Sequence, residues 1–106
     1  MKASELYTIL QGTGFPVAYD HFEEEQEAPF LVFVTDRTDN AFADNSVYKV
    51  RNHWSIYLCT KIKDESAEET TEAVLNDSGL VWDKVETYVD SEKLYEITYE
   101  IMTEDK

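Results

Sequence analysis

The stretch VYKVRNHWSIYLCTKIK, Val47 to Lys63, is the longest candidate strand in the chain and decides the fold. Its even positions are mostly apolar and include Trp54, Ile56 and Leu58, whereas the odd positions 49, 51, 53 and 55 are basic or polar. Successive side chains of a strand point to opposite faces. The pattern therefore predicts a long strand whose even face meets the core.

The segments on either side predict two helices and four further strands. A helix over 4–11 and strands over 17–19 and 30–35 precede this stretch, and a helix over 66–78 and strands over 80–89 and 93–103 follow it. In the last strand apolar side chains alternate with acidic or polar ones, which is typical of a sheet with one wet face. We expect an α+β fold in which residues 1–106 form one domain, with an antiparallel or mixed sheet of four to five strands and two helices on one face.

Capping residues mark the ends of both predicted helices. Ser4 is the expected N-cap of the first helix, and Gly12 is its expected end. Ser66 and Glu69 form an S-x-x-E capping box at the start of the second helix. Gly79 is the expected end of that helix.

The net charge of the chain disfavours negatively charged binding partners. Nine basic residues against 23 acidic ones give a net charge of −14. Nucleic-acid binding through a broad basic surface and binding to anionic membranes are therefore disfavoured, because both need clustered lysine and arginine. Cys59 is the only cysteine, so we expect no intrachain disulfide and a reducing site of synthesis. We also expect no signal peptide and no membrane span.

An acidic run stands directly before a strongly apolar strand. Its five carboxylates fall within eight residues, and FLVFVT, Phe30 to Thr35, follows at once. FLVFVT is apolar on both faces, so it should lie centrally or be covered on both sides. The acidic run is either a solvated turn that protects a neighbouring edge, or a connection that projects into an inter-subunit contact or a channel. Its members are Asp20, Glu23, Glu24, Glu25 and Glu27.

The stretch DRTDNAFADNS, residues 36–46, is rich in turn-forming residues and is expected to be a long loop. Its acids Asp36, Asp39 and Asp44 suggest a calcium-binding loop, but the glycine and the terminal glutamate of the EF-hand pattern are missing. Phe42 is the one large apolar residue in this loop. It is either a satellite of the core or an anchor that inserts into a partner.

The chain shows no constellation typical of catalysis or cofactor binding. His21 lies near Asp20 and Glu23, but this spacing matches no standard zinc motif. His53 and Cys59 share a strand face, yet they lie roughly 20 Å apart when extended. No phosphate-binding loop or nucleophile motif is present in the sequence. We therefore expect no enzyme, no cofactor and no metal site.

Several pieces of the chain, taken in order, resemble a known family. They are LYTIL, GFPVAYDHF, APFLVFV, VYKVRNHWSIYLCTK and EKLYEITYEI, and together they span roughly residues 6–102. In this order they resemble the small head–tail joining, or tail completion, proteins of tailed phages and prophages, which are close in fold to tail terminators. None of the pieces is specific alone, and the very high acidity exceeds what the resemblance requires.

The resemblance implies a structural role in the virion neck or tail, for a protein made in the host bacterial cytoplasm. Such subunits form a ring, commonly of six copies, at the head–tail junction or the tail end. The ring contacts head-connector and tail-tube proteins, and DNA passes through it without being bound specifically. The implied assembly state is therefore a homo-hexamer, with an isolated chain that can be monomeric.

A ring of acidic subunits constrains where the charges lie. Like charges at a contact cost energy, so acids are expected at the lumen, where they repel DNA, and on the outer surface. Basic side chains are then the expected partners of acids on neighbouring subunits. The candidates are Lys49, Arg51, Lys61, Lys63 and Lys84.

The alternative is an acidic DNA mimic that inhibits a basic nucleic-acid-binding protein. The net charge favours this alternative and is explained better by it than by a ring. It predicts a monomer or dimer whose affinity for a basic protein falls steeply as salt rises.

Overall fold

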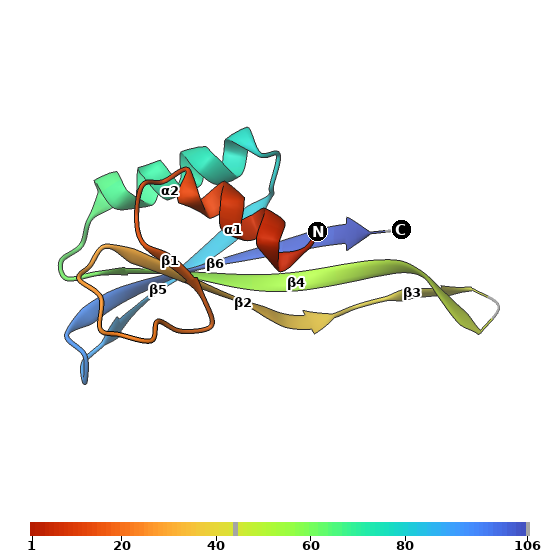
Figure 1. Cartoon of the computed structure of the whole chain (residues 1–106), viewed down its shortest axis with the longest axis horizontal. Coiled ribbons are helices and arrows are strands. Elements are labelled where there is room, and N and C mark those ends of the chain that lie inside the picture. The colour runs from red at the N-terminus through yellow and green to blue at the C-terminus, as the bar shows by residue number, and fades with distance from the viewer. Residues whose placement is uncertain (44, 106) are drawn as a thin grey trace.

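The computed structural model describes residues 1–43 and 45–105. Two helices and six strands follow one another along the chain (Figure 1). They are α1 (Ala3–Gln11), β1 (Val17–Tyr19), β2 (Phe30–Thr38), β3 (Ala41–Ala43), β4 (Ser46–Thr60), α2 (Glu65–Asp77), β5 (Trp82–Val89) and β6 (Leu94–Asp105).

The strands form one mixed sheet in the order β1-β2-β4-β6-β5, and β3 pairs with β4 off this path. The β1–β2 pair is parallel, and the remaining pairs are antiparallel. Both helices lie on one face of the sheet, which leaves the other face open (Figure 1). The predicted α+β class, with a mixed sheet and helices on one face, is confirmed.

The core lies between the helices and the sheet. Leu6 and Leu10 of α1 and Leu75 of α2 are fully buried against it. The sheet contributes alternate residues, as the strand patterns predicted: Leu31, Phe33, Trp54, Ile56, Leu58, Ile97, Tyr99 and Ile101. Burying this apolar surface is the main stabilising contribution that fixes the register of β4 between β2 and β6.

The predicted N-caps of both helices were wrong. Ser4 lies inside α1, and the Glu5 carboxylate instead accepts a hydrogen bond of 2.9 Å from the Lys2 amide. Asp64 caps α2, because its side chain accepts from the Ala67 amide at 3.0 Å. An aspartate one residue before the helix displaced Ser66 from the capping position, because a helix has room for one N-cap.

The end of α2 follows the prediction. Gly79 has a φ of +74°, a conformation that favours glycine. The next amide, that of Leu80, then donates to the Leu75 carbonyl at 3.0 Å, which turns the chain towards β5.

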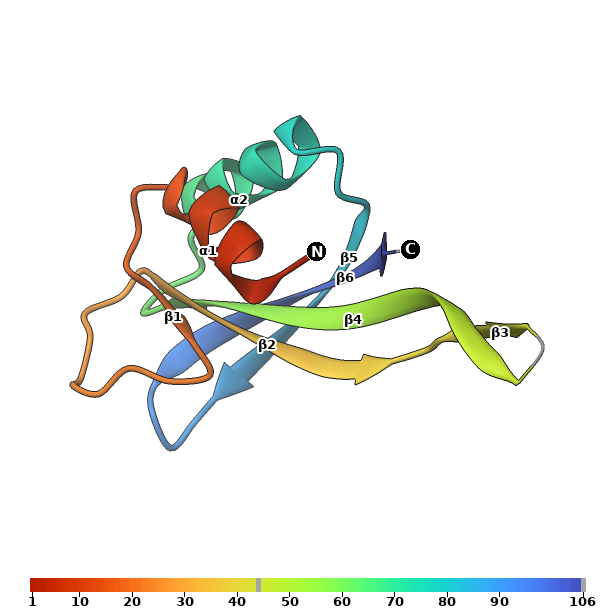
Figure 2. The same cartoon turned by 45° about the vertical axis from the view of Figure 1, so that its right-hand side comes forward.

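The long loop predicted over residues 36–46 is mostly strand. β2 continues to Thr38, and β3 pairs Ala41 with Lys49. A register shift between Thr35 and Arg37 marks the place where β2 departs from the regular ladder, and such bulges bend a strand. The end of β2, β3 and the first half of β4 form an extension that we call the arm, residues 36–53 (Figure 2).

Candidate assembly surface

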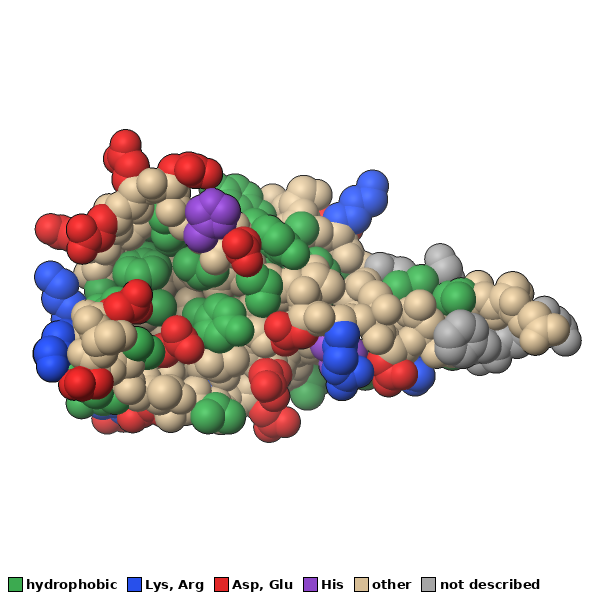
Figure 3. Space-filling view, turned by 90° about the horizontal axis from the view of Figure 1, so that it is seen from below, with side chains coloured by type: hydrophobic (Ala, Val, Ile, Leu, Met, Phe, Trp, Pro, Cys, Tyr) green, Lys and Arg blue, Asp and Glu red, His purple; other side chains and the backbone are tan. Residues whose placement is uncertain are grey.

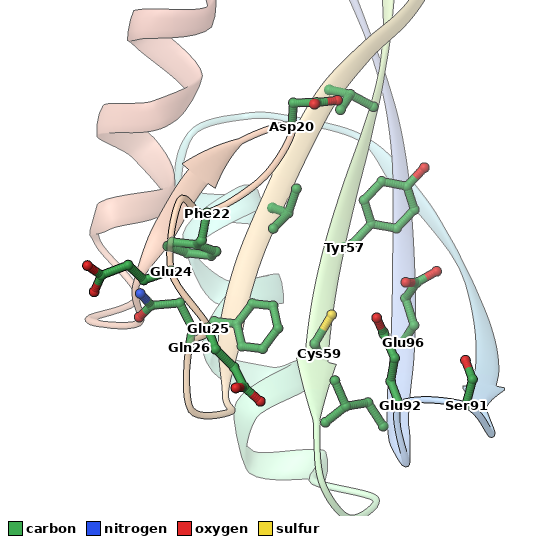
Figure 4. A pocket seen from close by; sticks show the side chains of 14 residues that line it. Asp20, Phe22, Glu24, Glu25, Gln26, Tyr57, Cys59, Ser91, Glu92 and Glu96 are labelled. Carbon is green, nitrogen blue, oxygen red and sulfur yellow. The ribbon is translucent and has the colours of Figure 1, made fainter.

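The acidic connection between β1 and β2 lies beside β2 and forms one wall of a hollow on the open face of the sheet (Figure 4). The hollow has a volume of about 890 Å³, and we call it the groove. Its lining residues are Asp20, Phe22, Glu24, Glu25, Gln26, Phe30, Val32, Val34, Tyr57, Cys59, Ser91, Glu92, Leu94 and Glu96. The connection β1–β2 thus takes part in a surface feature, beyond being a solvated turn.

The floor of the groove is apolar because alternate residues of β2 point away from the helices. Leu31 and Phe33 enter the core, so the neighbouring Val32 and Val34 must face the other side. Phe22 of the connection packs on Phe30 with ring centroids 5.6 Å apart and ring planes perpendicular. This contact ties the acidic connection to the first residue of β2.

The rim of the groove is acidic, and none of its lining residues, all within the described part of the chain, is basic. Burial, followed by the nearby Glu92, raises the pKa of Glu96 above its ordinary value. Burial, with Glu96 and Glu92, raises the pKa of the Cys59 thiol to about 12, so this thiol is unreactive near neutral pH. Apolar side chains fill the middle of this face and acids surround them (Figure 3).

The five predicted acids of the connection divide into two groups. Asp20, Glu24 and Glu25 line the groove, whereas Glu23 and Glu27 are exposed and lie outside its lining. His21 stands beside this wall, with Nδ1 3.0 Å from Asp20 and Nε2 3.4 Å from Glu23. These hydrogen bonds, that to Asp20 first, raise the pKa of His21.

The predicted residues of the arm lie outside the groove lining. Asp36 accepts a hydrogen bond from the Ser55 hydroxyl at the base of the arm. Asp39 pairs with Arg51, whose Nε also donates to the Asp39 carbonyl at 2.6 Å. Lys49 lies 3.7 Å from Glu104 of β6. The structure therefore separates the predicted site residues into two surfaces.

Two of the predicted residues of this region fall outside what the structure describes. Asp44 lies outside the described residues. Phe42 belongs to strand β3, and its side chain lies outside the described part. The anchor hypothesis for Phe42 therefore stays a prediction.

Lys63 and Lys84 pair within the chain instead of standing free for a neighbour. Both bind the buried carboxylate of Glu68, with Nζ–oxygen distances of 2.6 Å and 3.0 Å. Lys63 also contacts Glu86, and Lys84 contacts Glu72. Burial alone would raise the pKa of Glu68, but the hydrogen bonds from the two lysines outweigh it and lower that pKa. This cluster fastens α2 to β5.

Among the described residues there is neither a candidate metal site nor a helix that could span a membrane. They contain no group of three or more His, Cys, Asp or Glu side chains placed to hold a metal. Neither described helix is long and apolar enough to cross a membrane.

Sequence reasoning missed the groove floor as a site. The signal was present, because FLVFV is apolar on both faces and only one face is needed for the core. The contributions of Tyr57 and Leu94 could not be foreseen, since they depend on the register of β4 and β6 beside β2.

Comparisons with known proteins show a likeness in fold. No protein-family model matches the chain. No curated protein matches it either. Among solved structures, a chain from the "Virion of native gene transfer agent (GTA) particle" matches with a TM-score of 0.63. The two chains are 13% identical, and the match covers 92% of this chain and 84% of the other. At this identity the likeness shows a shared fold.

Proposed function

We propose that this chain is a structural protein of a tailed phage, prophage or phage-like particle. The observation that carries the proposal is the fold shared with a chain of a gene transfer agent virion over nearly the whole length of both chains. The sequence resemblance to head–tail joining proteins supports the same proposal. It rests on the order of sequence segments, whereas the structural match rests on the fold. The role that we propose is assembly without catalysis.

We place the protein in a ring at the head–tail junction or the tail end, through which DNA passes. Two features support a ring. The chain is elongated, with extents of 50 × 29 × 24 Å. The arm extends from the body of the chain along this axis, and the groove lies on the body behind the base of the arm (Figure 1). A subunit with two different contact surfaces, one of them on a projecting arm, can make head-to-tail contacts, which close into a ring if the rotation allows.

Deleting the gene from the phage or prophage that carries it tests this proposal. Electron microscopy of the lysate should then show filled heads and finished tails lying apart, and restoring the gene should rejoin them. Overlong or irregular tails would assign the ring to tail termination instead. Normal infectious particles without the gene would contradict the structural role.

The DNA-mimic alternative is favoured by one observation, the acidic rim of the groove, which no lining residue neutralises. It predicts that the isolated chain captures a basic protein from its host and releases it as salt rises, because screening weakens charge contacts. Release that is independent of salt would count against this alternative.

A further inference from the structure

The arm differs in charge from the rest of the chain. Its three acidic residues, Asp36, Asp39 and Asp44, are balanced by its three basic residues, Arg37, Lys49 and Arg51. The arm is therefore formally neutral, and the remaining residues carry the whole charge of −14. Two copies can approach at lower electrostatic cost through an arm than through their acidic bodies.

One cation of the arm is available for a partner. Arg37 is exposed, and it forms no ion pair with any of the side chains that the structure describes. Lys49 and Arg51 each have an acidic neighbour, at 3.7 Å and 3.6 Å, and stay partly exposed. Val47, at the far end of the arm, is 46% exposed and adds an apolar contact surface.

The groove has the complementary properties. Its floor is apolar, its rim carries Asp20, Glu24, Glu25, Glu92 and Glu96, and its lining has no base. The arm begins two residues after Val34 of the groove and extends away from it along the long axis, so its tip with Val47 cannot fold back into the groove of its own chain (Figure 1).

We propose that the arm of one copy docks into the groove of the next copy, with Arg37 facing the acidic rim and Val47 approaching the apolar floor. This contact rests on the proposed ring and specifies which surfaces would join its subunits. The contact is heterologous, so each copy donates one arm and receives another. A modest single contact is then strengthened by closure of the ring.

Site-directed cross-linking tests the contact. A chain with Val47→Cys on the arm and Ser91→Cys on the groove wall is treated with a short bismaleimide, both as concentrated protein and within particles. We expect a ladder of covalent oligomers. The control pairs Val47→Cys with Glu69→Cys on the exposed side of α2, and should give no ladder. The parent chain, with only the buried Cys59, gives the background.

A charge reversal tests the complementarity. Arg37→Glu in the cross-linking chain should slow the reaction by about tenfold or more at low salt, because it places an acid against an acidic rim. Lys2→Glu makes an equivalent charge change at an exposed site outside the arm, and should leave the rate within about twofold. Equal effects of the two reversals would contradict docking by charge.

The outcomes separate the contact from the function. Absence of a ladder in both preparations, or an equal ladder from the control, overturns the arm-in-groove contact. If particles are still defective without the gene, the structural role survives that result. A ladder together with normal particles after gene deletion supports the contact and overturns the proposed role.

Discussion

At the scale of single residues, Glu68 is the clearest case of a charge that the fold must satisfy. Its side chain is almost fully buried, yet it stays ionised because Lys63 and Lys84 both donate to it. Tyr99 and Glu72 continue the network with a hydrogen bond of 2.8 Å. The cluster sits where α2 meets the sheet, so its cost of desolvation is offset by contacts that position the helix.

We expect Glu68→Gln to lower the free energy of unfolding by about 1–2 kcal/mol at pH 7, since the partner lysines keep partial access to water. The pKa of Glu68 is lowered in the fold, so its stabilisation is present above the ordinary value of 4.5 and is lost as pH falls through the lowered pKa. Urea unfolding from pH 7 to pH 3 measures this.

The difference between wild type and Glu68→Gln should therefore shrink as pH falls. Glu69→Gln removes a neighbouring exposed carboxylate and is the matched control, with a change below about 0.5 kcal/mol at every pH. A difference for Glu68→Gln that stays constant with pH would contradict an ionised carboxylate at this position.

The N-cap of α2 gives a second prediction for single residues. Asp64→Ala should cost about 1 kcal/mol of unfolding free energy, because the Ala67 amide loses its acceptor. Ser66→Ala, at the position that the sequence pattern favoured, should cost less than half as much. Thermal unfolding of the two variants measures this, and the reverse order would mean that Ser66 is the cap.

At the scale of elements, the connection between β1 and β2 depends on one aromatic contact. Phe22→Ala removes the ring that packs on Phe30, so the connection should open more often. We expect faster hydrogen exchange of the amides of residues 21–28 and little change in the β4 amides. Glu23→Ala, on an exposed neighbour, should leave both sets unchanged, and equal exchange in the two variants would contradict the anchoring role of Phe22.

The arm gives the second prediction for an element. Among the described residues, the core cluster contains no member of the arm. Replacing residues 42–48 by Asn-Gly should close a two-residue turn between Ala41 and Lys49, which are already partners. We expect a Tm within about 4 °C of wild type, together with loss of self-association. A large fall in Tm would show that the arm supports the fold instead of a contact.

Elements with a strong pattern could be predicted, and those that depend on neighbours could not. The alternation in β4 and β6 identified core residues such as Trp54, Ile56 and Ile97, because one face of each strand must be buried. The segment 36–46 was read as a loop because aspartate and asparagine favour turns. Pairing with β4 overrides that preference, and no local pattern carries this information.

The candidate site was predictable only in part, for the same reason. Asp20, Glu24 and Glu25 were found from the density of charge alone, and they line the groove. Glu92 and Glu96 come from the β5–β6 turn and from β6, far from the acidic run in sequence. Their place beside the connection follows from the strand order, in which β6 lies next to β4.

At the scale of the whole molecule, the chain has a compact acidic body, with a groove on its open face, and a formally neutral arm that projects from the body (Figures 1 and 3). The acidic bodies of two copies repel each other. Copies that assemble therefore need a contact in which at least one of the two surfaces carries no net negative charge. A projecting arm and a groove on the body would give such a contact and set its direction. This arrangement supports the proposal that the chain acts in assembly.

The measurement that tests the structural role most directly is an electron cryomicroscopy reconstruction of purified particles from the phage or prophage that encodes this chain. We expect copies of this fold in a closed ring on the particle axis, at the head–tail junction or the tail end, with a central channel for DNA. Complete particles in which neither density nor peptides of this chain can be found would contradict the proposed function.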